Sequence, residues 1–466
     1  MKNITISKAI SIIFIISIFT KPLTFVKEIA TANYFGGSDF LEAFLIAYLL
    51  PSLFFNLVGG ILSSCFIPIY VNEKSVNTRN GKEFAQATFF LSIIMGVICA
   101  SLIYILAPLI IKLFAPGFVD NRYYLAVSYL QKLCPYISLI FLMYFLTNLL
   151  QAEKEFFYSS ITPFFVNLGA MTLMVIFHTK FNILSLIIGH YVGVGAALIF
   201  LLIKSRKYLL GLGVKIKLWT KPICEVLKLS FPISIGVSIT FFMNIADNFF
   251  ASMLSYGSVT ALHYANMLVT YTNTFIAFSI TKATLPFLSE YYSSGRMSKY
   301  YESITNHFIS LLIVYLPISL TLLLFNNEVI SLLFFSKNFN QIIGDKTSIA
   351  LFYYSLCLIP MGFHALFLPV YYSKKNTKTP MIIATVTAFL KVILSYILVK
   401  YYDIAGIAIA TLLAVSVQAF THVYINKIKL FKFFDILKLV VTGSFMILIM
   451  KIGAYLKFGE KFHYET

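Results

Sequence analysis

The chain has 466 residues, of which 59% are hydrophobic and 12% are charged, and its formal net charge at pH 7 is +18. Soluble proteins carry about a quarter charged residues, so this composition excludes an ordinary soluble domain. In a soluble protein such a positive charge would suggest nucleic acid. In a membrane protein it is the expected orientation signal, and we expect no nucleic-acid partner.

Apolar stretches long enough to cross a bilayer as helices recur along the whole chain. They lie near residues 6–32, 41–70, 84–112, 125–150, 160–178, 182–203, 229–254, 260–287, 305–325, 348–372, 380–400, 404–425 and 434–456. This pattern predicts an all-α polytopic membrane protein with about 13 spans. The stretch 328–335 is too short to cross and predicts a short interfacial helix. No small-residue cleavage pattern follows the first stretch, so we expect it to be retained as a span.

Lysine and arginine gather in alternate loops, and this asymmetry predicts that the N-terminus lies in the cytoplasm. The longest and most basic of these loops is 204–228. It predicts an N-lobe over 1–203, a cytoplasmic linker, a C-lobe over 229–426, and a last span and tail over 427–466. The cysteines are isolated, so no disulfide or metal site is predicted: Cys65, Cys99, Cys134, Cys224 and Cys357.

Three ionisable residues interrupt the first span, where a charge at mid-bilayer costs about 3 kcal/mol. Lys21 and Glu28 lie on one helix face, and Lys27 adjoins Glu28. One interpretation is a self-neutralising pair that only fixes the helix. The other is a cationic cavity wall, whose surplus positive charge favours an anionic ligand.

Further polar residues enter the later spans. Glu42, Asn56 and Ser64 of the second span complete the candidate substrate-binding set with Lys21, Lys27 and Glu28. Asp247, beside Asn244, and Lys391 each sit in the middle of an apolar span. If their spans meet, they form a buried pair, whose role is either structural or ion-coupling.

Single histidines in apolar spans, namely His190, His263 and His364, are interpreted as hydrogen-bonded core residues rather than ligands. The sequence has no P-loop, GxSxG or HExxH motif, which argues against an ATP-driven pump. We therefore predict no catalytic residues and no cofactor, with coupling to an ion gradient or the membrane potential.

Several short motifs occur along the chain in an order that is typical of one protein family. They are "FTKPLTFVKEIATANYFGGSDFLEAFLIAYLLPSLF" in the first two spans, "CFIPIY", "APGF" after span three, "FASMLSYGSVTALHYANML" before span eight and "YYSKKNTKTP" before span eleven. With these motifs the chain resembles the MurJ (MviN) family of lipid II flippases, part of the superfamily of multidrug, oligosaccharidyl-lipid and polysaccharide exporters. The resemblance covers almost the whole chain.

The resemblance implies two six-helix lobes in a V around a central cationic cavity, here with one extra C-terminal helix. It implies a monomeric transporter, not an enzyme, in the bacterial inner membrane among membrane lipids. The implied cargo is undecaprenyl-pyrophosphate-linked disaccharide pentapeptide, moved to the periplasmic leaflet by alternating access for peptidoglycan biosynthesis and cell shape. Lys21 and Lys27 fall on two family arginines that are thought to hold the pyrophosphate, and Glu42 falls on the family's acid.

The chain departs from the family at two positions where other basic residues are expected, because Phe55 and Met267 stand there. The resemblance implies a sodium site between spans seven and eleven in some family members, and Lys391 falls in that region. Our hypothesis is that its ammonium, paired with Asp247, replaces that ion. Three alternatives stay open: an exporter of another polyprenyl-linked glycan or a drug, an integral membrane glycosyltransferase using Asp39, and a decayed flippase.

Overall fold

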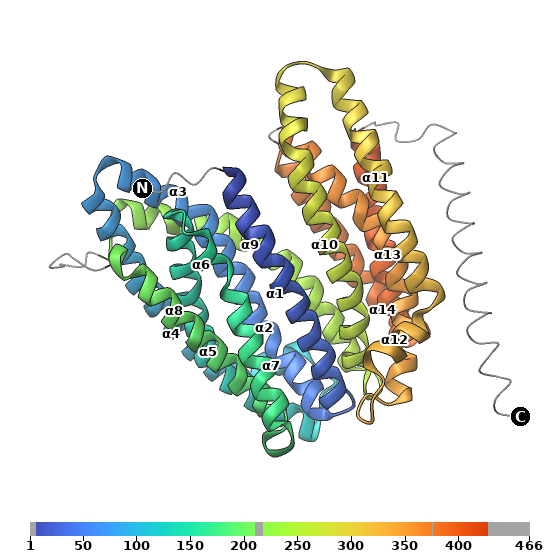
Figure 1. The fold of residues 1–466 in the computed structure, drawn as a ribbon. Coiled ribbons are helices and arrows are strands. Elements are labelled where there is room, and N and C mark those ends of the chain that lie inside the picture. The colour runs from blue at the N-terminus through green and yellow to red at the C-terminus, as the bar shows by residue number, and fades with distance from the viewer. Residues whose placement is uncertain (1–5, 210–217, 375, 427–466) are drawn as a thin grey trace, which may run out of the picture. The chain divides into compact units, whose positions relative to one another are not determined.

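The computed structural model describes residues 6–209, 218–374 and 376–426, and every regular element in these ranges is helical (Figure 1). The elements are α1 (Ile6–Phe35), α2 (Asp39–Ile61), the π-helical turn η1 (Leu62–Phe66), α3 (Ile67–Val76), α4 (Thr78–Phe114), α5 (Asp120–Ala152), α6 (Phe156–Ser160), α7 (Thr162–Phe181), α8 (Leu184–Leu209), α9 (Lys221–Ser252), α10 (Ser258–Ser293), α11 (Met297–Leu324), α12 (Asn326–Phe334), α13 (Gln341–Ser373) and α14 (Lys378–Asn426). The predicted helical fold class is confirmed.

Each predicted span before residue 427 overlaps one of these helices, and α12 is the short helix expected near 328–335. Among the described residues, nine helical stretches are long and apolar enough to cross a membrane. One of them, α14, holds two predicted spans, which meet at Asp403 with φ 53° and ψ −133°. The predicted span 434–456 lies outside the described residues.

The chain divides into two compact units, and the first comprises Met1–Thr260 and Leu333–Ile343. Within it α5 packs against α2, α4 and α8, while α7 packs against α1 and α8. Fully buried side chains recur along α5 at spacings of three and four residues: Leu130, Leu133, Ile137 and Ile140. Lipid tails are as apolar as these side chains, so close packing rather than the hydrophobic effect holds such helices together.

The second unit comprises Ala261–Leu332 and Gly344–Thr466. Hydrogen bonds between its helices add to the packing. The Ser319 hydroxyl of α11 donates to the Ser355 carbonyl of α13 at 2.7 Å, and the Tyr315 hydroxyl donates to Asn273 Oδ1 of α10 at 2.8 Å. Each unit therefore has its own internal core.

The predicted linker 204–228 is helical at both ends, because α8 extends to Leu209 and α9 begins at Lys221. Residues 210–217 between them lie outside the described residues. α9 packs against α2 and α4 in the first unit. The role of 204–228 as the boundary between two lobes stays a prediction.

Candidate functional site

The charges of the first span separate into a buried pair and an exposed lysine. Lys27 is 7% exposed, and its Nζ lies 2.7 Å from Glu28 Oε1. Lys21, six residues earlier on α1, is exposed. The Lys27–Glu28 ion pair fits either of the two interpretations. The predicted role of this pair in substrate binding stays a prediction.

Aromatic rings of α2 and α5 surround His190 of α8 in the first unit. The centroid of the His190 ring lies 5.2 Å from that of the Tyr48 ring and 5.7 Å from that of the Tyr136 ring. His190 Nδ1 also contacts the Leu186 carbonyl oxygen at 2.8 Å, which confirms it as a buried, hydrogen-bonded core histidine.

The remaining candidates of the second span are exposed. Asn56 donates from Nδ2 to the Ser52 carbonyl at 2.9 Å, and Ser64 lies in the π-helical turn η1. Phe55 stands where the family resemblance predicts a basic residue. The centroid of its ring lies 5.6 Å from that of the Tyr144 ring and 6.1 Å from that of the Tyr136 ring. An aromatic contact therefore occupies the place of that positive charge.

The two mid-span residues predicted to pair are both buried, but they belong to different units. Asp247 of α9 is 4% exposed and lies in the first unit, whereas Lys391 of α14 is 3% exposed and lies in the second. Asn244, one turn before Asp247, accepts a hydrogen bond from Asn248 Nδ2 at its carbonyl oxygen. The predicted ion pair stays a prediction.

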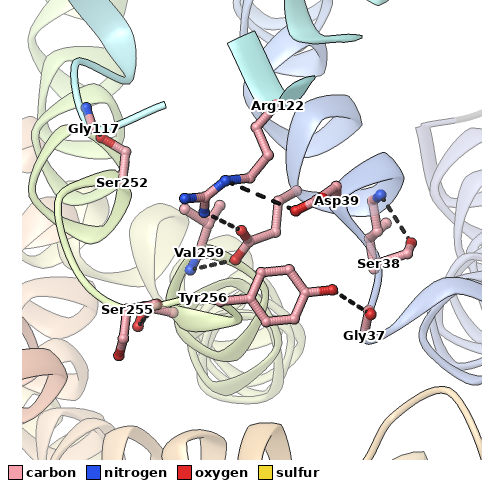
Figure 2. A network of polar contacts seen from close by, with 12 residues as sticks. Gly37, Ser38, Asp39, Gly117, Arg122, Ser252, Ser255, Tyr256 and Val259 are labelled. Atoms are coloured by element: carbon pink, nitrogen blue, oxygen red, sulfur yellow. Dashed lines mark hydrogen bonds and ion pairs between the residues drawn. The ribbon is translucent and has the colours of Figure 1, made fainter. Parts of the chain in front are cut away.

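A second polar cluster, which we call the Glu42 network, joins chain segments that are distant in sequence (Figure 2). The Glu42 carboxylate is buried and accepts from Arg122 Nη1 at 3.1 Å and from the Val259 backbone N–H at 3.2 Å. Asp39 lies 3.8 Å from Arg122 Nε. Glu42 thus places a negative charge at the N-terminal turn of α10, where the helix dipole favours it.

Two further contacts complete the Glu42 network. The Tyr256 hydroxyl donates to the Gly37 carbonyl oxygen, and burial, with the charges of Asp39 and Glu42, raises the pKa of Tyr256 to about 12. Tyr256 therefore keeps its donor proton at any physiological pH. The Gly117 N–H donates to Ser252 Oγ at 3.2 Å. A side chain at Gly117 would place its Cβ 2.1 Å from the Ser252 carbonyl oxygen, so this approach requires glycine.

Sequence reasoning placed Glu42 among the substrate residues and did not find Arg122 as its partner, because 80 residues separate the two. The signal in the sequence was a single basic residue in the connection after the predicted span 84–112. Among the described residues, no group of three or more histidine, cysteine, aspartate or glutamate side chains could hold a metal ion.

Comparison with known proteins now adds to this geometry. A family model described as "Lipid II flippase MurJ" matches residues 31–465. A probable lipid II flippase MurJ from Buchnera aphidicola subsp. Baizongia pistaciae is 26% identical over 428 residues, covering 89% of this chain and 82% of that protein. A relative of the same description from Aquifex aeolicus is 25% identical, covering 91% and 84%.

Solved structures agree in fold. A lipid II flippase MurJ in an inward closed conformation matches with a TM-score of 0.82 and 24% identity, covering 95% of this chain and 92% of that one. An inward-facing multidrug resistance transporter of the MATE family and MOP superfamily matches with a TM-score of 0.73 and 15% identity, covering 87% and 94%. The chain is a multi-pass protein of the bacterial inner membrane. It belongs to the lipid II flippase MurJ family.

Proposed function

We propose that this chain is a lipid II flippase, which moves the undecaprenyl-pyrophosphate-linked peptidoglycan precursor from the cytoplasmic to the periplasmic leaflet. The family match over residues 31–465 carries the proposal. Non-covalent movement is the whole reaction, so we propose a transporter without catalytic activity. Its partners would be lipid II and the surrounding membrane lipids, and it would act as a monomer by alternating access between two lobes.

The proposed cargo carries a pyrophosphate, and Lys27 with Lys21 would bind it. The ion pair with Glu28 is compatible with this role, because Glu28 neutralises the charge of Lys27 while no cargo is bound. A phosphate that approaches Lys27 would share its ammonium with Glu28, because a lysine head has three donors. Lysine binds phosphate as a point charge, without the planar fork of arginine.

Complementation of a bacterium depleted of its own lipid II flippase tests the proposal. The wild-type chain should restore growth. Absence of growth despite normal insertion into the membrane would contradict the proposed function.

A double variant separates cargo binding by Lys27 from a structural ion pair. Lys27→Met alone removes the positive charge beside the partly buried Glu28 carboxylate, so it should fail in either case. Lys27→Met with Glu28→Leu removes both charges. We expect this double variant to insert normally and still fail to support growth, because the anion site is lost. Growth restored to the wild-type level would show that the pair is only structural.

A second candidate function is export of another polyprenyl-linked glycan. It is favoured by Phe55, which packs against Tyr136 and Tyr144 where a basic residue is expected. Flipping in proteoliposomes, with lipid II and with a polyprenyl-pyrophosphate glycan that lacks the peptide, distinguishes the two. Faster movement of lipid II supports the first candidate.

A further inference from the structure

Two histidines in the second unit contact one another inside its helical core. His364 of α13 and His422 of α14 are 58 residues apart in sequence, and His364 Nδ1 lies 3.1 Å from His422 Nε2. The His422 side chain is fully buried. Its ring stacks on Phe367 with a centroid distance of 5.8 Å. This separation of the two nitrogens fits one hydrogen shared between the rings.

Polar groups continue from both rings of the pair. Gln418 Nε2 lies 3.2 Å from His364 Nδ1, and the Tyr371 hydroxyl lies 3.2 Å from His422 Nδ1. The Tyr371 hydroxyl can donate or accept a hydrogen bond, whereas the single lone pair of His364 Nδ1 can accept from only one of His422 Nε2 and Gln418 Nε2. Tyr371 and His422 can therefore keep their positions whether the histidine pair is neutral or carries one additional proton.

A lysine at the end of α13 sets the direction of this hydrogen-bond chain. Lys374 Nζ donates to Asn426 Oδ1 at 3.5 Å, which turns the Asn426 amide so that Nδ2 donates to the Tyr371 hydroxyl at 2.9 Å. The Tyr371 hydrogen is then directed to His422 Nδ1. In the neutral pair His422 accordingly carries its hydrogen on Nε2 and donates to His364.

Among the described residues, the further titratable or charged groups with contacts to this hydrogen-bond chain lie on, or directly after, two helices. They are Tyr371 and Lys374 at the end of α13, and Tyr300 of α11, whose hydroxyl lies 3.1 Å from Ser373 Oγ. Burial lowers the pKa of the Lys374 amine, because it disfavours the charged form.

We propose that His364 and His422 together form one proton-binding site. Hydronium gives its proton to His422 Nδ1. One O–H bond of the hydronium breaks, one N–H bond forms and water is left, and no electrons are transferred. The Tyr371 hydroxyl rotates from donor to acceptor, while the hydrogen between the two rings stays shared. Two imidazolium ions 3.1 Å apart would repel each other strongly, so the pair binds a single proton.

A proton in this position supplies a candidate coupling ion for transport. That role as a coupling site rests on the proposed flippase function. Proton binding by the pair does not rest on it, and it can be measured without cargo. The two proposals can therefore fail separately.

The test uses the full chain in lipid nanodiscs, with histidine labelled by nitrogen-15, titrated by NMR from pH 8 to pH 5. His364→Asn and His422→Asn variants assign the ring signals. We expect both rings to respond together, with one midpoint and one proton. Two separate midpoints with two protons, or neutral rings throughout in the folded protein, would overturn the site.

A milder variant tests the acceptor and keeps the site testable if the histidine variants do not fold. Tyr371→Phe removes the hydroxyl that stabilises the cation, so we expect the midpoint to move to lower pH by about one unit. His307→Gln, on α11 of the same unit, is the control and should leave the midpoint unchanged. An unchanged midpoint in Tyr371→Phe would contradict the geometry. Flipping of lipid II, assayed in parallel, tests only the proposed function.

Discussion

Two acids of the first unit, the partly buried Glu28 and the buried Glu42, are neutralised in different ways. Glu28 pairs with the adjacent Lys27 on its own helix, whereas Glu42 pairs with Arg122 of another helix and also accepts from the Val259 N–H. A buried carboxylate costs several kcal/mol unless a charge and hydrogen bonds compensate it. The Glu42 contacts therefore both satisfy the acid and hold three chain segments together.

The first prediction concerns Glu42→Gln. Its amide removes the negative charge, so the partly buried Arg122 keeps Asp39 at 3.8 Å as its charged partner. We expect the free energy of unfolding to fall by about 3 kcal/mol. The protein is unfolded in mixed micelles by raising the fraction of a denaturing detergent. Far-UV circular dichroism, which follows the loss of helix, measures the change.

A matched control exists on the surface. Glu83 pairs with Arg79 at 2.8 Å on α4, but its side chain is 50% exposed. Because exposed pairs contribute little, Glu83→Gln should change the free energy of unfolding by about 0.5 kcal/mol or less. Equal losses in the two variants would mean that burial of Glu42 has no energetic consequence.

At the scale of elements, a cluster of charges ties the end of α8 to the turn between α5 and α6. Glu155 Oε1 lies 3.2 Å from Lys207 Nζ and 3.6 Å from Lys204 Nζ. Burial alone would raise the pKa of Glu155, but the hydrogen bond from Lys207 and the charges of both lysines outweigh it and lower the pKa. The turn is thus fixed to α8 by its acid.

This shift gives a prediction with a defined pH dependence. A carboxylate with a lowered pKa contributes its stability fully above its ordinary pKa of 4.5 and loses it as the pH falls through the lower folded value. Wild-type protein should exceed Glu155→Gln in stability by up to about 1 kcal/mol at pH 7, and the difference should shrink below pH 4.5. Detergent-denaturant unfolding at several pH values measures it. A difference that grows on acidification would contradict the assignment.

The helices could be predicted from sequence because apolar length and loop charge are local signals. Contacts between distant segments could not, because periodicity places a residue on a helix face without naming the helix that faces it. The pairs Glu42–Arg122 and His364–His422 were both missed for this reason. Lys27 and Glu28 are neighbours in the chain, so their pairing was one of the two interpretations available from sequence.

For the whole molecule, loop charge predicts which ends of the helices face the cytoplasm. After replacement of the native cysteines, Arg296→Cys and Lys337→Cys place single thiols in exposed turns. A membrane-impermeant thiol reagent added to intact cells should label Lys337→Cys only. With the N-terminus in the cytoplasm, the loop after the eighth predicted span, which holds Arg296, is cytoplasmic, and the loop after the ninth, which holds Lys337, lies outside. Labelling of both sites should follow disruption of the membrane. The reverse pattern would invert the topology.

The Glu42 network has a consequence for biogenesis. Glu42 is synthesised 217 residues before Val259, and Arg122 emerges between them. During insertion the guanidinium is therefore available to neutralise the carboxylate well before the first turn of α10 leaves the ribosome. The nascent chain then presents α10 with an acceptor that is already in place, so the order of translation matches the order in which these contacts can form.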